Sequence, residues 1–149
     1  MRNKILVLAC VVAASSALAA CGGSASYADG TYSAQSEVYI NEDDDSEDGN
    51  GYGVVSITIK DGAITECTYK TYEVDGTLKD ENYGKEGGSV ANKDYFNKAQ
   101  KAVAACDQYA KALVEKQNVK DVDAITGATI NYNEFQDAVT LALKQASGK

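Results

Sequence analysis

The sequence predicts an α+β fold, in which an antiparallel sheet is packed by one long helix and a C-terminal helix follows a turn at residues 126–129. Two observations lead to this prediction. Residues 31–74 are rich in β-branched and aromatic side chains around Asp-Gly dipeptides, which is typical of antiparallel strands and their turns. Residues 92–147 instead repeat apolar side chains every three or four positions, which indicates helices. Strands that precede the helices, rather than alternating with them, favour an α+β arrangement.

Three segments account for the predicted sheet. The strands are expected at residues 31–40, 54–60 and 63–74. The dipeptide Asp61-Gly62 joins the second and third strands as a β-hairpin, because it is a turn dipeptide between two β-branched runs. Ile64 is out of phase with Cys67 and Tyr69 along the third strand. We therefore expect a glycine bulge at Gly62.

Residues 41–53 are acidic and rich in glycine, and they are expected to form a solvated loop. The spacing of acids from Asp44 onward is similar to the opening of an EF-hand calcium loop. The twelfth position of such a loop is Val55 here, where calcium binding needs a bidentate Glu. A plain charged loop is therefore the preferred interpretation, and no metal site is expected.

The long helix is predicted from residue 92 to residue 117, after a polar and irregular segment at 77–94. Its apolar stripe comprises Phe96, Ala99, Val103, Cys106, Ala110 and Leu113. Residues 118–125 are expected to be a short strand or an extended segment. The last helix is predicted at 132–147, where Asn131 and Glu134 have the spacing of a capping box. It would bury Phe135, Ala138, Val139, Ala142 and Ala146.

The first twenty residues have the pattern of a secretory signal, because Arg2 and Lys4 precede an apolar run at 5–18 that ends in small residues. The run is shorter than a membrane-spanning helix requires. Its end, Leu-Ala-Ala-Cys-Gly, resembles a bacterial lipobox, which implies lipid attachment at Cys21; the alternative is an ordinary cysteine. We therefore expect a lipoprotein signal peptide at 1–20, a tether at 21–28 and one domain at 29–149.

Composition excludes several classes of function. The net charge is −8, and cleavage after residue 20 would remove two basic residues and no acid, leaving 12 basic and 22 acidic residues and a charge of −10. Such a charge argues against nucleic acid as a partner. The chain has no histidine, which excludes an imidazole base or metal ligand. Cys67 and Cys106 are either two small core residues or a disulfide, and they lack the Cys-x-x-Cys spacing of a redox pair.

The turn Thr126-Gly127-Ala128-Thr129 is the main candidate site. Gly127 permits a positive φ, Ala128 adds little bulk, and Thr129 places a hydroxyl close to the start of a helix, where free N–H groups attract phosphate. Taken alone, these four residues are as compatible with a plain strand-to-helix connection as with a phosphate-binding turn. With Asp123 they read Asp-x-x-Thr-Gly-Ala-Thr, which resembles the attachment motif of the FMN-binding domain family.

The resemblance implies a covalent cofactor. In that family an ApbE-type flavin transferase joins FMN through a phosphoester to the last residue of the motif, here Thr129. Asp123 would then serve recognition by the transferase, and residues 126–128 would complete the cofactor-binding turn. The Asp-Gly-Thr-Tyr at 29–32 and the Lys-Asp-Gly turn with Ile-Thr at 60–65 also match the family, so that the resemblance covers most of residues 29–147. Thr126 in place of a more frequent Ser, and Ile-Asn after Thr129, depart from its pattern.

Within the family, the chain is most similar to small bacterial flavin-bearing lipoproteins associated with extracytosolic electron transfer. The resemblance implies an electron carrier rather than an enzyme, lipid-anchored to the cell membrane on its extracytosolic face. Its partners would be the flavin transferase, a membrane electron donor and an extracytosolic electron acceptor. Tyr132 is a candidate to stack on the flavin. Two alternatives remain: a lipid-anchored protein that binds a small ligand, such as a flavin, noncovalently, and an interaction lipoprotein in which the turn is incidental.

Overall fold

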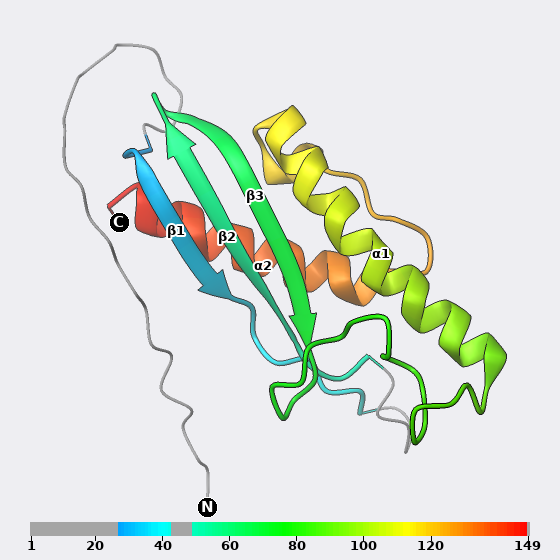
Figure 1. The fold of residues 1–149 in the computed structure, drawn as a ribbon. Coiled ribbons are helices and arrows are strands. Elements are labelled where there is room, and N and C mark those ends of the chain that lie inside the picture. Colours follow the sequence, from blue (N-terminus) through cyan, green and yellow to red (C-terminus); the bar gives the residue numbers. More distant parts are fainter. Residues whose placement is uncertain (1–26, 43–48, 149) are drawn as a thin grey trace, which may run out of the picture.

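Within the described residues, three antiparallel strands and two helices form the fold (Figure 1). The structure is a computed structural model that describes residues 27–42 and 49–148. In chain order the elements are β1 (Gly30–Gln35), β2 (Tyr52–Lys60), β3 (Ala63–Tyr72), α1 (Lys93–Lys116), the 3-10 turn η1 (Val119–Asp121) and α2 (Thr129–Ala146). This arrangement confirms the predicted α+β class, with its antiparallel sheet, long helix and C-terminal helix.

The sheet has the order β1-β2-β3, and each neighbouring pair is antiparallel. Lys60 pairs with Ala63, so the hairpin between β2 and β3 has a two-residue turn. Both turn residues have positive φ, 52° at Asp61 and 74° at Gly62, as a type I′ turn requires. The predicted hairpin is confirmed, but the predicted bulge at Gly62 is wrong, since this turn closes the ladder without an extra residue.

The pairing register between β2 and β3 shifts by one residue within β3. Thr58 of β2 pairs with Glu66, whereas Ile59 pairs with Ile64, so Thr65 has no partner across the ladder. The extra residue shifts the alternation of β3 by one position. It thereby allows Ile64 to be buried on the same face as Tyr69, which explains the phase change in the sequence.

β1 is shorter than the predicted strand at 31–40. The strand ends at Gln35. The next residue, Ser36, is buried, and its Oγ accepts a hydrogen bond from the Gly53 N–H at 2.9 Å. Past this point, Tyr39 pairs with Gly51 in an isolated bridge. The apolar residues around Tyr39 are exposed, and their β propensity alone does not extend the strand.

Both helices pack on one face of the sheet, α1 against β3 and α2 against β1 and β2 (Figure 1). The largest fully buried side chains between the layers are Tyr109, Phe135, Ile57, Ile59 and Leu113. α1 begins after Asn92, whose side chain accepts the Tyr95 N–H at 3.0 Å, and ends at Gln117 with a φ of 60°. These caps agree with the predicted boundaries of 92 and 117.

α2 begins at Thr129, three residues before its predicted start. The predicted capping box is therefore wrong, because Asn131 and Glu134 both lie inside the helix and are buried. The Asn131 side chain donates to the backbone oxygen of Ala102 at 3.1 Å, so it joins α2 to α1 instead of capping α2. The residue that precedes the helix, Ala128, has no side-chain group to cap it.

Residues 118–125 form the short turn η1 and then run extended, with Val122 buried. At the far end of α2, Ala28 donates its N–H to the backbone oxygen of Ala146 at 2.9 Å. The chain thus enters the described domain beside the C-terminal end of α2 (Figure 1). Within the described part, neither helix is apolar over a length that could cross a membrane. The predicted signal at 1–20, Cys21 and the acids around Asp44 lie outside the described residues.

Candidate cofactor site at the start of α2

The turn before α2 is tight and leaves both of its threonines, Thr126 and Thr129, exposed. Gly127 has a φ of 84°, in the left-handed region that favours glycine. The Ala128 N–H donates to the backbone oxygen of Ile125 at 3.0 Å, and its methyl group is buried. Thr129 follows as the first residue of α2 and is exposed. The hydroxyl is therefore available to another molecule while the backbone beneath it is fixed.

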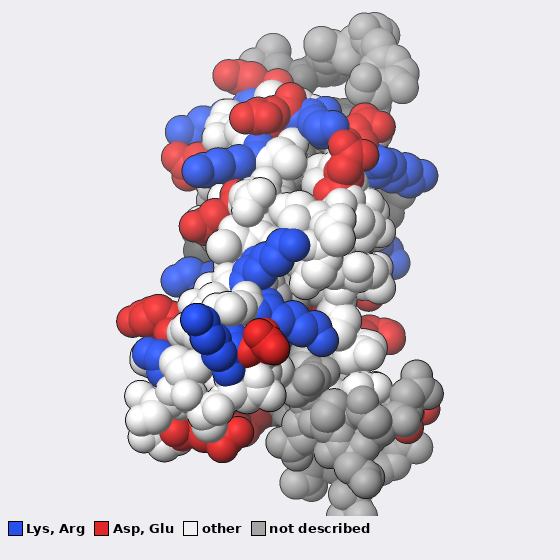
Figure 2. Space-filling model, turned by 90° about the vertical axis from the view of Figure 1, so that its right-hand side faces the viewer, with Lys and Arg blue, Asp and Glu red and all other residues white. Residues whose placement is uncertain are grey.

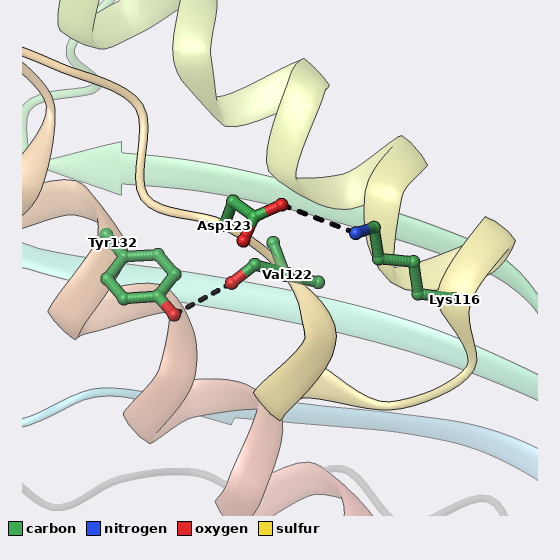
Figure 3. Close-up of polar contacts among 4 residues, drawn as sticks. All are labelled: Lys116, Val122, Asp123 and Tyr132. Carbon is green, nitrogen blue, oxygen red and sulfur yellow. Dashed lines mark hydrogen bonds and ion pairs between the residues drawn. The ribbon is translucent and has the colours of Figure 1, made fainter.

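A buried tyrosine of α1 holds this turn. The Tyr109 hydroxyl accepts the Ile125 N–H at 2.9 Å and donates to the Ala128 oxygen at 3.2 Å, so it bridges the two ends of the turn. The Tyr132 ring packs against the Tyr109 ring, with centroids 5.6 Å apart, and its hydroxyl donates to the Val122 oxygen at 2.8 Å (Figure 3). Two tyrosines thus fix the segment that leads into α2.

The N-terminus of α2 has unsatisfied donors. Among the described residues, no acceptor satisfies the backbone N–H groups of Thr129, Ile130 and Asn131. Such groups carry the positive end of the helix dipole and bind anions. Lys101 of α1 lies beside the turn, because a Cβ added to Gly127 would be 3.5 Å from its Nζ. Positive charge and free donors therefore lie next to the turn that carries Thr129.

A pocket of about 220 Å³ has Thr129 in its wall. Thr129 and Ile130 line it from α2, Tyr95 and Lys98 line it from α1, and Lys79 and Tyr83 line it from the loop before α1. Its wall thus combines aromatic rings, aliphatic groups and two ammonium groups. On the face of the molecule that carries α1, lysine side chains lie over a central area that is otherwise largely uncharged (Figure 2). Such a site suits a flat, aromatic and negatively charged ligand.

The predicted site residues divide into two groups. Gly127, Ala128 and Thr129 all line the pocket, whereas Thr126 and Asp123 do not. The side chain of Asp123 is 95 % exposed, and its carboxylate forms an ion pair of 3.4 Å with Lys116 at the end of α1 (Figure 3). Asp123 is therefore open to solvent and lies outside the pocket.

Sequence reasoning missed the residues that form the opposite wall of the pocket. The segment that carries Lys79 and Tyr83 is polar and irregular, and no periodicity marks these side chains. Lys79 is nevertheless buried, and its Nζ donates to the Gly49 oxygen at 3.1 Å and lies 5.1 Å from the Tyr83 ring centroid. Tyr132, the predicted stacking residue, does not line the pocket, and the rings that do belong to Tyr83 and Tyr95.

A buried carboxyl lies behind the pocket. Burial raises the pKa of Glu134 from 4.5 to about 7, and the positive charge of Lys79 opposes the rise. Burial likewise lowers the pKa of Lys79, and Glu134 opposes that change. The nearby Tyr69 hydroxyl donates to the Asn131 oxygen at 2.6 Å, which leaves the Glu134 carboxyl without that donor.

The two cysteines of the domain are free thiols, which decides between the two predicted alternatives. Burial raises the pKa of Cys67 to about 12 and also raises the pKa of Cys106. The Cys106 Sγ lies 3.4 Å from the Asn131 amide nitrogen and 3.9 Å from the Thr71 hydroxyl. Both residues therefore act as small core groups rather than reactive thiols.

One turn of this α+β domain brings together a hydroxyl, free helix N–H groups and a pocket with aromatic residues and lysines. These features are typical of proteins that bind a phosphorylated aromatic cofactor. More particularly, the chain belongs to the FMN-binding domain family, whose model matches residues 49–144. The matched region contains α1, the turn and nearly all of α2. Membership of this family supports FMN as the cofactor and is consistent with a flavoprotein carrier.

Two solved structures are similar to this chain. The crystal structure of a protein from Clostridium perfringens is 29 % identical, with a TM-score of 0.57, over 80 % of this chain and 88 % of that one. A solution structure from Clostridium thermocellum is 27 % identical, with a TM-score of 0.42, over 79 % of this chain and 91 % of that one. Among curated proteins, none matches the chain.

The residues at the turn fit FMN. The free N–H groups of α2 and Lys101 offer donors and positive charge to a phosphate, and the pocket offers the rings of Tyr83 and Tyr95 to a flat heterocycle. The pocket is smaller than the roughly 300–1,000 Å³ that encloses most drug-sized ligands. It would therefore hold part of the cofactor and leave the rest accessible from outside.

Proposed function

We propose that this chain is an exported, lipid-anchored flavoprotein that carries FMN covalently on Thr129 and serves as an electron carrier in extracytosolic electron transfer. One observation carries the proposal: Thr129 is exposed, is the first residue of the uncapped helix α2, and lines the pocket that contains Tyr83 and Tyr95. A phosphoester at the Thr129 hydroxyl would place the phosphate against free N–H groups and the flavin beside the pocket.

The protein's own residues would hold and orient the cofactor. The Thr129 oxygen would form the ester bond, and the α2 N–H groups with Lys101 would offset the phosphate charge. Tyr109 would keep the turn in place through its two hydrogen bonds. FMN, when bound, supplies one- and two-electron redox chemistry that no side chain of this protein provides.

A carrier role fits the openness of the site. A carrier must exchange electrons with two partners, and a pocket that holds only part of the flavin leaves its edge available to them. A covalent bond would retain the cofactor outside the cytosol, where it could not easily be replaced. Lipid attachment at Cys21 would keep the domain at the cell membrane, within reach of a membrane electron donor.

Maturation would require a separate enzyme. An ApbE-type flavin transferase would supply the Mg²⁺ and the catalytic groups, and this chain would supply the acceptor hydroxyl and the recognition motif. The exposed Asp123, which lies outside the pocket, is suited to recognition by that transferase.

The test is the intact mass of the protein purified from its host, or coexpressed with an active flavin transferase, together with flavin fluorescence of the denatured band. The wild type should gain the mass of one FMN less water. Thr129→Ser keeps a hydroxyl and should keep the flavin, whereas Thr129→Ala should lose it. Thr140→Ala, an exposed threonine elsewhere on α2, is the matched control and should be fully modified.

The same experiment separates the alternatives. Covalent flavin in Thr129→Ala would rule out Thr129 as the attachment residue. An unmodified wild type whose flavin is released by denaturation would favour a noncovalent ligand-binding protein that uses the same pocket. An unmodified wild type without any bound small molecule would leave an interaction lipoprotein as the remaining interpretation.

A further inference from the structure

Glu134 is a buried acid on α2 that the proposed attachment chemistry does not use. It is only 3 % exposed, and neither carboxyl oxygen has a hydrogen-bond partner among the described residues. A buried carboxylate without partners is strongly disfavoured, so such a group is normally protonated or compensated by a nearby charge. We therefore expect Glu134 either to be protonated or to have its negative charge offset by a nearby positive group.

The titratable groups near Glu134 come from a loop, a strand and both helices. The titratable groups that face it are Lys79 from the loop before α1, Tyr69 from β3, Cys106 from α1 and Asp137 from α2 itself. Of these, Lys79 carries the positive charge, but its Nζ donates to the Gly49 oxygen, and no ion pair joins it to Glu134 within the described residues. The attraction between Lys79 and Glu134 thus acts through space and leaves the carboxyl free to take a proton.

One layer of polar residues connects Glu134 to the pocket. Lys79 and Asn131 both line the pocket, and Asn131 lies one helical turn before Glu134 on the same face of α2. The backbone oxygen of Asn131 accepts a hydrogen bond from the Tyr69 hydroxyl at 2.6 Å. Tyr69 and Glu134 meet at Gly53, where an added Cβ would lie 2.9 Å from the Tyr69 hydroxyl oxygen and 3.1 Å from the Glu134 Cβ. A charge in the pocket therefore acts on Glu134 across the buried residues Lys79 and Asn131, which line the pocket.

We propose that Glu134 is an internal proton-binding site linked to the charge in the adjacent pocket. Its carboxylate takes a proton from solvent when negative charge is added to the pocket and returns it when that charge is removed. The inference rests on the proposed function, because reduction of FMN by an electron donor would add the negative charge. Two electrons pass from the donor to the cofactor, and one proton passes from solvent to the Glu134 oxygen, so Glu134 offsets one of the two added negative charges and the only bond formed at this residue is O–H.

The linkage has a defined pH range. Near neutral pH the carboxyl of Glu134 is partly ionised, because burial holds its pKa well above that of an exposed acid. Negative charge in the pocket raises this pKa further, so proton uptake is greatest just above pH 7. One proton per two electrons changes the reduction equilibrium tenfold per pH unit, which corresponds to about 30 mV per pH unit.

The first test uses the full-length chain in detergent, prepared without flavin transferase and labelled with ¹³C at the glutamate carboxyls. The Glu134 resonance is identified by its loss in Glu134→Gln, and its titration is followed by NMR. We expect it to titrate close to pH 7. Lys98→Glu places negative charge on the pocket wall and should raise the pKa of Glu134, whereas Lys111→Glu, on the same helix but away from the pocket, should not.

The second test measures the midpoint potential of the flavin-bearing protein from pH 5.5 to pH 9. Glu134→Gln should reduce the slope above pH 7 by about 30 mV per pH unit relative to the wild type. Glu115→Gln, which removes an exposed carboxyl near the C-terminal end of α1, should leave the slope unchanged.

The outcomes separate the two proposals. A Glu134 that titrates like an exposed acid, or whose pKa does not respond to Lys98→Glu, overturns the linkage whether or not flavin is attached. An unchanged slope in Glu134→Gln overturns it in the flavin-bearing protein. An unmodified mass of the wild type counts only against covalent attachment, and the NMR titration then decides the linkage alone.

Discussion

The hydroxyl of Tyr109 donates a 3.2 Å hydrogen bond to the backbone oxygen of Ala128, and with its second bond, to Ile125, it closes the turn that precedes Thr129. A buried side chain of α1 therefore fixes a backbone segment that lies about twenty residues later in the chain. The exposed acceptor hydroxyl depends on a core residue that no attachment motif contains.

Replacing Tyr109 with Phe should loosen this turn without leaving a large cavity. The Ile125 N–H would lose its acceptor, so we expect a loss of about 1–3 kcal/mol in the free energy of unfolding. Urea denaturation measures this loss, and the rate of flavin attachment by the transferase should also fall. Tyr39→Phe removes an exposed hydroxyl and is the control. Equal stability of the two variants would contradict a role for Tyr109 in holding the turn.

Asp123 should matter for recognition rather than for stability. The carboxylate is almost fully exposed, and its ion pair with Lys116 is screened by solvent, so Asp123→Asn should barely change the free energy of unfolding. Flavin attachment should nevertheless fall strongly. Lys116→Ala breaks the same ion pair and keeps the carboxylate, so it should still be modified. If both variants lost flavin equally, the ion pair rather than the carboxylate would be the recognised feature.

Gly127→Ala should combine backbone strain with a local effect on the site. The φ of 84° costs a residue with a Cβ about 1–2 kcal/mol, and the new methyl group would contact the end of the Lys101 side chain. Gly62→Ala is a matched control, since its φ is 74° and a Cβ there meets nothing within 4 Å. Both variants should lose similar stability in urea, and only Gly127→Ala should slow flavin attachment.

Stability should decrease as pH rises through the acidic range because of Glu134. Its folded-state pKa is raised, so between 4.5 and about 7 the native state binds more protons than the unfolded state. The contribution of Glu134 is therefore fully present below pH 4.5 and is lost by about pH 7, with a size of roughly 3 kcal/mol. Urea denaturation of the wild type and of Glu134→Gln at pH 5 and pH 8 measures it, and the variant should show a smaller difference.

The buried thiols should resist alkylation in the native state. Because burial raises the pKa of Cys67 to about 12 and also that of Cys106, little thiolate is present at pH 8. Peptide mass spectrometry after iodoacetamide should find both residues unmodified before denaturation and both alkylated after it, without a reducing agent. A need for reductant would mean that the two residues form a disulfide.

Sequence reasoning predicted those features that repeat along the chain or that form a contiguous motif. The boundaries of α1 were confirmed, because a regular apolar stripe ends at residues that cap a helix. The hairpin was confirmed because Asp61-Gly62 suits a turn in which both residues have positive φ. Local pattern did not reveal that Ser36 would end β1, since that depends on a hydrogen bond to Gly53 on a neighbouring strand.

The start of α2 and its capping box were predicted wrongly because tertiary contacts, rather than the local sequence, decide where this helix begins. Asn131 and Glu134 have the spacing of a capping box, but contacts with α1 and β3 draw both residues into the core, and the helix begins earlier. The turn itself was predicted because its four residues are adjacent. Lys79 and Tyr83 were not predicted as site residues, because they reach the pocket from an irregular loop that is distant in sequence.

α2 is also a spacer. The chain enters the described domain beside Ala146, at one end of this helix, and Thr129 lies at the other end. Eighteen residues at 1.5 Å each separate these points by about 27 Å, close to the thickness of the hydrocarbon core of a membrane. In the proposed lipid-anchored protein, Thr129 can therefore lie farther from the lipid surface than the point where the chain enters the domain. A short tether would then let the domain pivot about its anchor, so that one cofactor could meet a donor at the membrane and an acceptor above it.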